Sequence, residues 1–167
     1  MSSSPEWLPP KLNFANDYGG NWGKFLIKLY DVYLKDFTKP PFAKFREKSV
    51  YRENAIDQST NKEKGFWHLV QEDFNKPTAQ VVIERAEKIV WARAIIDNAD
   101  MLEIKKWDIK EKGEYKSYLW LKELEYVVVL KHMKKEGKIR GFFVKTAHHV
   151  YPYGRRSLER KYNRGIQ

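Results

Sequence analysis

The sequence contains no cysteine, which excludes disulfide bonds, thiolate metal sites and a cysteine nucleophile. Long apolar runs are also absent: the longest in the expected sheet region is Tyr126–Leu130, which is too short to span a bilayer. The N-terminus has neither the basic nor the apolar segment of a signal peptide, so we expect a cytoplasmic protein that does not bind membranes. Glycine-rich phosphate loops and the common metal-binding motifs are missing, so we expect no metal and no cofactor.

The net charge of +10 is concentrated at the C-terminal end. Residues 131–167 hold eleven Lys or Arg against two Asp or Glu, whereas residues 1–60 hold nine against seven and residues 61–130 twelve against thirteen. The same end carries three of the four histidines and several aromatic residues. Lysine and arginine neutralise phosphates, aromatic rings stack on bases, and imidazoles transfer protons near neutral pH. This composition indicates a surface that binds a polyanion.

The N-terminal part of the chain, residues 1–64, is expected to be a helical arm followed by a loop. Apolar residues in the segment 22–37 recur every three or four positions, which predicts a helix. Asn21 is a suitable N-cap, and Pro40-Pro41 ends the helix. The polar residues 42–64 predict a long surface loop.

The remaining part, residues 65–167, is expected to combine a helix with an antiparallel sheet in one compact domain with the arm. Residues 65–70 predict a short strand, and Thr78 is a suitable cap for a helix over 79–97. From residue 104 the hydrophobic period becomes two, which predicts four strands joined by short turns: 104–109, 115–121, 126–132 and 139–151. A short helix over 155–164 follows. The predicted fold class is α+β, with N-terminal helices packed on a four-stranded antiparallel meander.

Alternation along the last predicted strand divides its residues between two faces. One face is expected to hold Phe142, Val144, Thr146, His148 and Val150. The opposite face is expected to hold Ile139, Phe143, Lys145, Ala147, His149 and Tyr151. Only one of the two adjacent histidines then faces a cleft, and the sequence leaves open which one; the other is a surface histidine.

Other candidate residues have two interpretations each. His68 is either a core histidine bonded to the backbone or a second imidazole beside the sheet. Arg93 interrupts an apolar stripe, so it either reaches solvent at the edge or binds a phosphate in a cleft. The arginines of the last helix form either a solvated face or a phosphate clamp: Arg155, Arg156 and Arg160.

Several short motifs are distributed along the chain: Tyr18-Gly-Gly-Asn-Trp22, Phe66-Trp-His-Leu69, Arg85-Ala-Glu-Lys-Ile-Val-Trp91, Ala92-Arg93-Ala-Ile-Ile96, Tyr126-Val-Val-Val-Leu130, Thr146-Ala-His-His-Val150 and Arg155-Arg156 to Tyr162. Together they resemble phage-encoded, toxin-like branches of the barnase/EndoU/colicin/RelE-like nuclease superfamily, over roughly residues 12–164. The resemblance implies a nuclease-like core in residues 65–167, with helices on a small antiparallel sheet and an RNA-cleaving site on the sheet face. By position it implicates His68, Arg85, Arg93, Thr146 and Arg155/Arg156. The family favours an aromatic pair where this chain has His148-His149.

We therefore expect a metal-independent, toxin-like endoribonuclease that cleaves tRNA, rRNA or mRNA through the 2′-hydroxyl of the RNA. The candidate catalytic residues are His68, Arg85, Arg93, Thr146, His148 and His149. The candidate RNA-binding residues are Lys131, Lys145, Arg155, Arg156, Arg160 and Tyr162. One alternative is a non-catalytic nucleic-acid-binding module of phage or mobile-element origin, and another is a protein whose basic end binds an acidic inhibitor or antitoxin.

Overall fold

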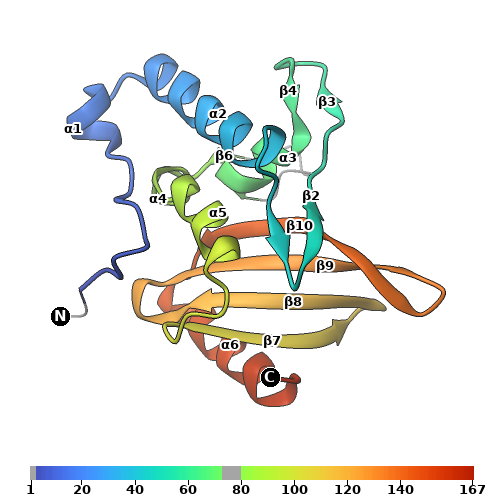
Figure 1. Ribbon diagram of the computed structural model, residues 1–167. Helices are drawn as coiled ribbons and strands as arrows, with labels where there is room; N and C mark the ends of the chain where they lie inside the picture. The colour runs from blue at the N-terminus through green and yellow to red at the C-terminus, as the bar shows by residue number, and fades with distance from the viewer. Residues whose placement is uncertain (1–2, 73–79) are drawn as a thin grey trace.

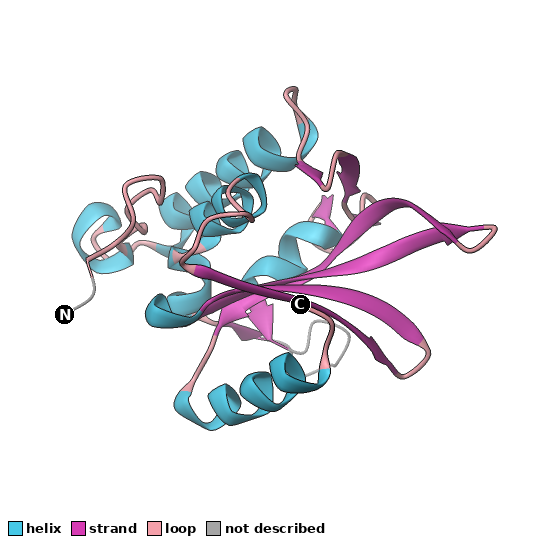
Figure 2. Cartoon of the chain, turned by 60° about the horizontal axis from the view of Figure 1, so that its bottom comes forward, coloured by secondary structure: helices cyan, strands magenta, loops and turns pink. Residues whose placement is uncertain are grey.

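The computed structural model describes residues 3–72 and 80–167, and it has three layers (Figure 1). A six-stranded mixed sheet forms the middle layer, with strand order β1-β2-β10-β9-β8-β7. The N-terminal helices cover one face of this sheet, and a single C-terminal helix covers the other (Figure 2). The sheet strands are β1 (Lys44–Phe45), β2 (Lys48–Tyr51), β7 (Ile104–Glu111), β8 (Glu114–Leu121), β9 (Tyr126–Lys135) and β10 (Lys138–His149).

The remaining elements surround this sheet. Two small hairpins pair β3 (Ile56–Asp57) with β4 (Lys62–Glu63) and β5 (Gln71–Glu72) with β6 (Gln80–Val81). The helices are α1 (Phe14–Tyr18), α2 (Trp22–Thr38), α3 (Lys64–Val70), α4 (Ile83–Glu87), α5 (Ile89–Asp97) and α6 (Pro152–Arg164), with a 3₁₀ turn at Lys122–Leu124. Asn21 caps α2 as predicted, because its side chain accepts a hydrogen bond from the Lys24 amide at 3.0 Å. In the described part of the chain, no helix is long and apolar enough to cross a membrane.

The predicted four-stranded antiparallel meander is wrong as a description of the sheet. The four predicted segments do form consecutive antiparallel strands, β7 to β10. However, β2 extends the sheet by pairing parallel to β10 at Phe142 and Phe143, and β1 then pairs with β2. The N-terminal part of the chain therefore contributes strands to the same sheet as the C-terminal part.

The prediction that residues 42–64 form a long surface loop is also wrong. This segment contains β1 to β4. Strands β1 and β2 bury only Phe45 and Val50 among polar neighbours, so the alternating pattern is too short to detect. These two strands form through pairing at the sheet edge and not through local propensity.

The segments before the sheet also differ from the prediction. Residues 65–70 belong to helix α3 and not to a strand, and α3 is buried on most sides, so its apolar run shows no helical period. The helix predicted over 79–97 is broken at Lys88 into α4 and α5, and it is preceded by β6. The predicted cap Thr78 lies outside the described residues.

Two apolar cores fill the spaces between the layers. The larger core lies between the N-terminal helices and the sheet and includes Phe66, Leu130 and Phe142. The smaller core lies between the sheet and α6, and its centre is the fully buried Trp107. Trp107 stacks on Tyr118 of the neighbouring strand with ring centroids 4.9 Å apart, and it packs edge-on against Tyr162 of α6 at 5.5 Å, so aromatic packing holds α6 on the sheet.

A polar network on the sheet links β7, β8, β9 and the β1–β2 turn. Arg46 donates two hydrogen bonds to the Asp108 carboxylate, at 2.8 and 3.0 Å, and the Ser117 hydroxyl donates a third at 2.6 Å. The Nε2 atom of His132 lies 2.7 Å from the Ser117 oxygen. Because Ser117 gives its only proton to Asp108, His132 must be the donor in that contact. The network therefore connects the added edge strands to the middle of the sheet.

We predict that this network makes stability depend on pH. Burial alone would raise the pKa of Asp108, but His132, whose Nε2 lies 3.8 Å away, and hydrogen bonds from Arg46 and Ser117 hold this pKa below its ordinary range. A depressed pKa contributes stability above the unfolded-state value of about 3.9, and this stability is lost as the pH falls through the folded-state pKa. Asp108→Asn should lower the free energy of unfolding at pH 7 by about 1–3 kcal/mol.

Urea unfolding at pH 7 and at pH 3 measures this effect. The variant should lose less stability than the wild type on acidification, because it lacks the titrating carboxylate. The exposed Asp31 provides a matched control, and Asp31→Asn should change stability little at either pH. Equal acid sensitivity of the wild type and Asp108→Asn would contradict the assignment.

Candidate functional site

The last strand, β10, has two register shifts against β9, one between Ile139 and Gly141 and one nearer its end. The register shifts between Val144 and Thr146, so one extra residue is inserted there. Before the bulge, Phe142 and Val144 belong to the core under the N-terminal helices. After it, Thr146 and His148 lie opposite Val129 and Val127, which belong to the core under α6.

The expectation that Phe142, Val144, Thr146 and His148 share one face is therefore wrong. A single inserted residue reverses the alternation of a strand, and no local signal in the sequence marked the bulge. The bulge turns Thr146 and His148 towards α6.

A cleft of about 340 Å³ lies where these two residues emerge. Its walls are the α6-facing side of β8, β9 and β10, the start of α6, and α4. Among residues 3–72 and 80–167, the charged residues that line it are four cations and one acid: Arg85, Lys116, Lys145, Lys161 and Glu72. The cleft is therefore a concave and mainly cationic surface.

Arg85 connects three elements at the back of the cleft. Its Nη2 atom donates to the Thr146 hydroxyl at 2.8 Å and to the backbone carbonyl of His68, and its Nε atom donates to the carbonyl of Leu69 at 3.3 Å. Helix α4 is thereby joined to α3 and to β10. Arg85 thus places a positive charge beside Thr146 in a fixed position.

His148 is a partly buried histidine in the cleft wall. Its Nδ1 atom lies 2.9 Å from the backbone carbonyl of His149. A carbonyl oxygen only accepts hydrogen bonds, so Nδ1 carries the proton and Nε2 of the neutral ring is unprotonated. Burial lowers the pKa of His148, and the charges of Arg85 and Lys161 lower it further. His148 is therefore a neutral base at physiological pH.

His149 borders the same cleft but is held on the other side of the strand. Its Nδ1 atom lies 2.7 Å from the Lys88 ammonium, which can only donate, so this nitrogen accepts. Burial lowers the pKa of His149, and Lys88 adds to the effect. The ring also packs edge-on against Tyr151, with centroids 4.7 Å apart. Of the two adjacent histidines, His148 is the one on the α6 face.

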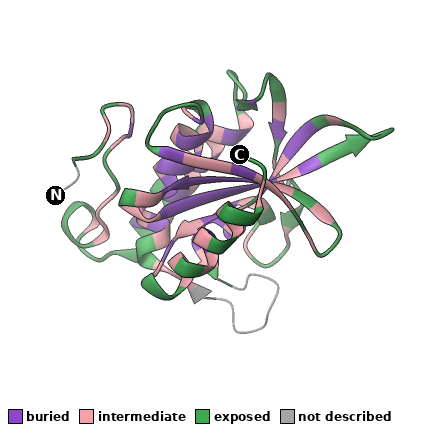
Figure 3. Ribbon diagram, turned by 90° about the horizontal axis from the view of Figure 1, so that it is seen from below, coloured by how far each residue is buried: buried purple, intermediate pink, exposed green. Residues whose placement is uncertain are grey.

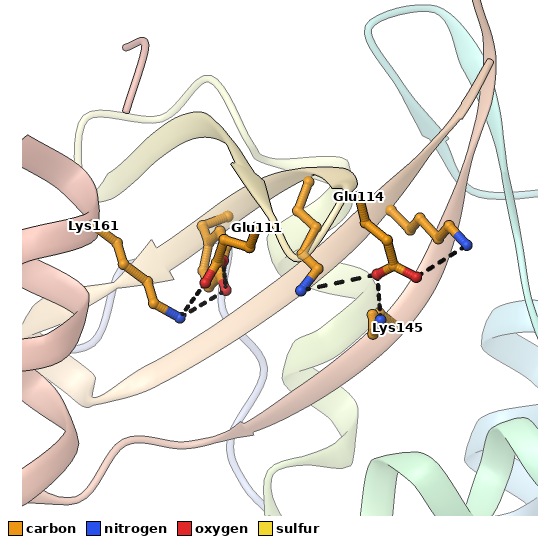
Figure 4. A network of polar contacts seen from close by, with 7 residues as sticks. Glu111, Glu114, Lys145 and Lys161 are labelled. Atoms are coloured by element: carbon orange, nitrogen blue, oxygen red, sulfur yellow. Dashed lines mark hydrogen bonds and ion pairs between the residues drawn. The ribbon is translucent and has the colours of Figure 1, made fainter. Parts of the chain in front are cut away.

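Lysine side chains converge beside the cleft (Figure 4). The Glu114 carboxylate contacts the ammonium groups of Lys131 at 3.2 Å, Lys116 at 3.9 Å and Lys145. Hydrogen bonds from Lys145 and Lys131 lower the pKa of Glu114 to about 2. Three lysines from three strands thus share one carboxylate.

A second set of polar contacts lies next to α6 and is also drawn in Figure 4. Lys161 contacts Glu111 at 2.9 Å, and the Tyr118 hydroxyl donates to the same carboxylate at 2.5 Å. Burial would raise the pKa of Glu111, but Tyr118 and Lys161 lower it. These contacts position Lys161 at the cleft from the helix that forms its wall.

His68 lines an adjoining hollow of about 580 Å³. This hollow shares Lys145 and Thr146 with the cleft, and it also contacts Lys131 and Met133. Burial lowers the pKa of His68, and the charge of Arg85 contributes to the lowering. The two histidines therefore border neighbouring hollows that meet at Thr146.

Arg93 does not lie in the cleft, contrary to the phosphate-binding interpretation. It pairs with Asp97 at 2.8 Å and donates to the backbone carbonyls of Asp36 at 2.6 Å and Pro41 at 2.9 Å. These contacts tie α5 to the end of α2. Arg93 supports the helical layer, and nothing in its surroundings favours a catalytic role.

The candidate RNA-binding residues of α6 lie in three different environments. Arg155 pairs with Glu125 at 3.4 Å, whereas Arg156 and Arg160 are exposed on the outward face, as Figure 3 illustrates for this helix. Tyr162 packs on Trp107 with centroids 5.5 Å apart, so it anchors the helix and is not presented for base stacking.

Sequence reasoning missed three groups that line the cleft. Lys116 and Lys161 reach it from β8 and α6. Tyr153 is 80% exposed at the cleft and stacks on Tyr151 with centroids 5.5 Å apart. The aromatic residues of the basic end were a usable signal for Tyr153, whereas the convergence of the lysines depends on strand pairing.

The described residues contain no group of three or more His, Asp or Glu side chains that could hold a metal ion.

Comparison with known proteins gives no match, since no family model, no curated protein and no solved structure matches the chain.

Proposed function

We propose that this protein is a toxin-like endoribonuclease of the cytoplasm that cleaves RNA without a metal ion. The observation that carries the proposal is His148, a neutral imidazole with an unprotonated Nε2, in a cleft whose described lining includes four cations. Attack of the RNA 2′-hydroxyl on the adjacent phosphate needs a base to accept the hydroxyl proton and positive charges to stabilise the transition state.

The reaction uses the 2′-hydroxyl of the RNA as its nucleophile. The Nε2 atom of His148 accepts the hydroxyl proton, and the resulting oxygen bonds to the adjacent phosphorus. The bond from phosphorus to the 5′ oxygen of the next nucleotide breaks, and that oxygen takes a proton. The products are a 2′,3′-cyclic phosphate and a 5′-hydroxyl end.

Lysines of the cleft stabilise the developing charge, and Lys116 is the proposed proton donor to the leaving oxygen. Burial lowers the pKa of Lys116, and the neighbouring charge of Lys145 contributes. A lowered pKa makes an ammonium group a better acid. Arg85 and Thr146, which bond to each other at 2.8 Å, orient the phosphate.

The base-stacking residue of this proposal is Tyr153. Its exposed ring, already stacked on Tyr151, offers a flat surface for an unpaired base at the cleft. This favours single-stranded RNA as the substrate.

A non-catalytic nucleic-acid-binding module is the second candidate. The lysine cluster around Glu114 supports it, because binding a phosphate needs these cations but no base. Both candidates predict binding that weakens with salt, and only the first predicts a product.

One experiment separates the two functions. Purified protein is incubated in EDTA with a single-stranded RNA and with a DNA of the same sequence, and the products are resolved by size. The nuclease should cleave only the RNA and leave cyclic phosphate ends, because DNA has no 2′-hydroxyl. Salt-sensitive binding without product supports the module, and cleavage that requires Mg²⁺ contradicts the mechanism.

We predict that Glu114→Gln tightens RNA binding severalfold at low salt. The carboxylate occupies lysines that a phosphate would otherwise contact, and the amide removes this competition. Fluorescence anisotropy with a labelled RNA measures the affinity. The exposed Glu123 offers a control with the same charge change, and Glu123→Gln should have a smaller effect. Equal effects would show that only net charge matters.

A further inference from the structure

The hairpin of β9 and β10 extends beyond the rest of the sheet as a two-stranded arm (Figures 1 and 3). Strand β9 pairs with β8 only as far as Lys131, and β10 pairs with β2 only at Phe142 and Phe143. In the described part of the chain, residues 133–141 therefore pair as strands only with one another. The turn at Glu136 and Gly137 has positive φ at both residues, which is typical of a tight hairpin.

The arm is strongly basic. Residues 131–140 contain five cations and a single acid, Glu136. Lys135 and Lys138 are exposed and lie directly opposite each other in the ladder. Like charges in such a pair destabilise a hairpin, and a bound anion relieves the repulsion. Neither lysine has an ion-pair partner among residues 3–72 and 80–167.

The arm and the cleft form one continuous face. Alternation along β9 puts Lys135 on the same side as Lys131 and Met133, and its partner Lys138 shares that side. Lys131 and Met133 line the hollow beside the cleft, and that hollow shares Lys145 and Thr146 with the cleft. At about 3.3 Å per residue, the path from Lys138 to Thr146 is roughly 26 Å long.

We infer that the arm is a second RNA-binding site, which holds the phosphates of the single strand that leaves the cleft. This inference rests on the proposed function. The cations follow one narrow row along two strands, so a single backbone can contact them in succession. Long RNAs engage both the cleft and the arm, whereas short oligonucleotides engage only the cleft.

The test compares two RNAs and two double variants. The RNAs are a single-stranded 5-mer and a single-stranded 20-mer, with binding measured by fluorescence anisotropy over a range of salt concentrations. Lys135→Gln/Lys138→Gln removes the two arm charges. Lys24→Gln/Lys28→Gln removes two exposed charges of α2, in the helical layer on the opposite side of the sheet, and is the matched control.

The arm variant should bind the 20-mer about tenfold more weakly. The negative slope of log K against log salt should become shallower by about 1.4. It should bind the 5-mer like the wild type, and the control should bind both RNAs like the wild type. Unfolding curves that match the wild type would show that both variants are folded.

Two outcomes overturn the inference in different ways. If the wild type binds both RNAs and the arm variant binds the 20-mer equally well, the arm site is rejected and the cleft function stands. If the wild type binds neither RNA, the proposed function fails and the arm inference fails with it. Tighter binding of the arm to a 20-base-pair duplex than to the single strand would reject the single-stranded path.

Discussion

Replacing His148 with alanine is expected to slow RNA cleavage by about 10²–10⁴-fold and to leave RNA affinity nearly unchanged. The imidazole acts as the base in the proposed reaction, whereas Arg85, Lys145 and Lys161 supply the binding charges. Single-turnover cleavage measures the chemical step, and anisotropy with a DNA of the same sequence measures binding without reaction.

The neighbouring His149 gives a matched control. His149→Ala removes an imidazole of the same size one residue away, and this imidazole is held by Lys88 on the other side of the strand. Its effect on cleavage should be much smaller. Equal losses in the two variants would indicate a general disturbance of the end of β10 and would contradict a specific role for His148.

The pH profile gives a further readout of the same residue. Burial lowers the pKa of His148, so the neutral form persists below the ordinary value of about 6.5. Because the base form is the active one, the cleavage rate should stay on its plateau below pH 6.5 and decrease only at lower pH. A midpoint above 6.5 would exclude His148 as the base.

Trp107→Ala is expected to give the largest loss of stability, about 3–5 kcal/mol. Trp107 is fully buried between the sheet and α6, where it contacts Tyr118, Trp120 and Tyr162. Its removal leaves a cavity at the centre of the smaller core and loosens the helix that forms one wall of the cleft. Urea unfolding followed by circular dichroism measures the change.

Two further variants keep this second prediction testable. Trp107→Phe retains an aromatic ring and should recover a large part of the lost stability and the RNA binding. Trp22 is 37% exposed on α2, so Trp22→Ala should be less costly. A loss below about 1 kcal/mol for Trp107→Ala would show that the packing of α6 does not depend on this residue.

The regular parts of the fold were predictable because their signals are local. Asn21 precedes a long amphipathic segment, so the start of α2 could be read from neighbouring residues. The segments of β7 to β10 alternate clearly and are separated by short polar turns. In contrast, β2 is four residues long and buries only Val50, so its parallel pairing with β10 left no readable pattern.

The candidate site was predictable only in part. The charge count and the histidines pointed to the C-terminal region, and Thr146, His148 and Lys145 do line the cleft. Arg93 was misassigned because an arginine in an apolar stripe has the same pattern whether it reaches a cleft or bonds to Asp97 and two backbone carbonyls. Lys116 and Lys161 were missed because they approach the cleft from β8 and α6, far apart in the chain.

Composition and periodicity were sufficient to locate the positive charge near the C-terminus and to predict the main strands and the long helix. These features depend only on residues that are neighbours in the sequence. The faces that the residues of β10 present were decided by two register shifts, and the second of them, between Val144 and Thr146, moves Thr146 and His148 towards α6. The grouping of Lys116, Lys131 and Lys145 around Glu114 depends on the register of three strands. Such register is set by contacts between distant segments, and no local pattern encodes it.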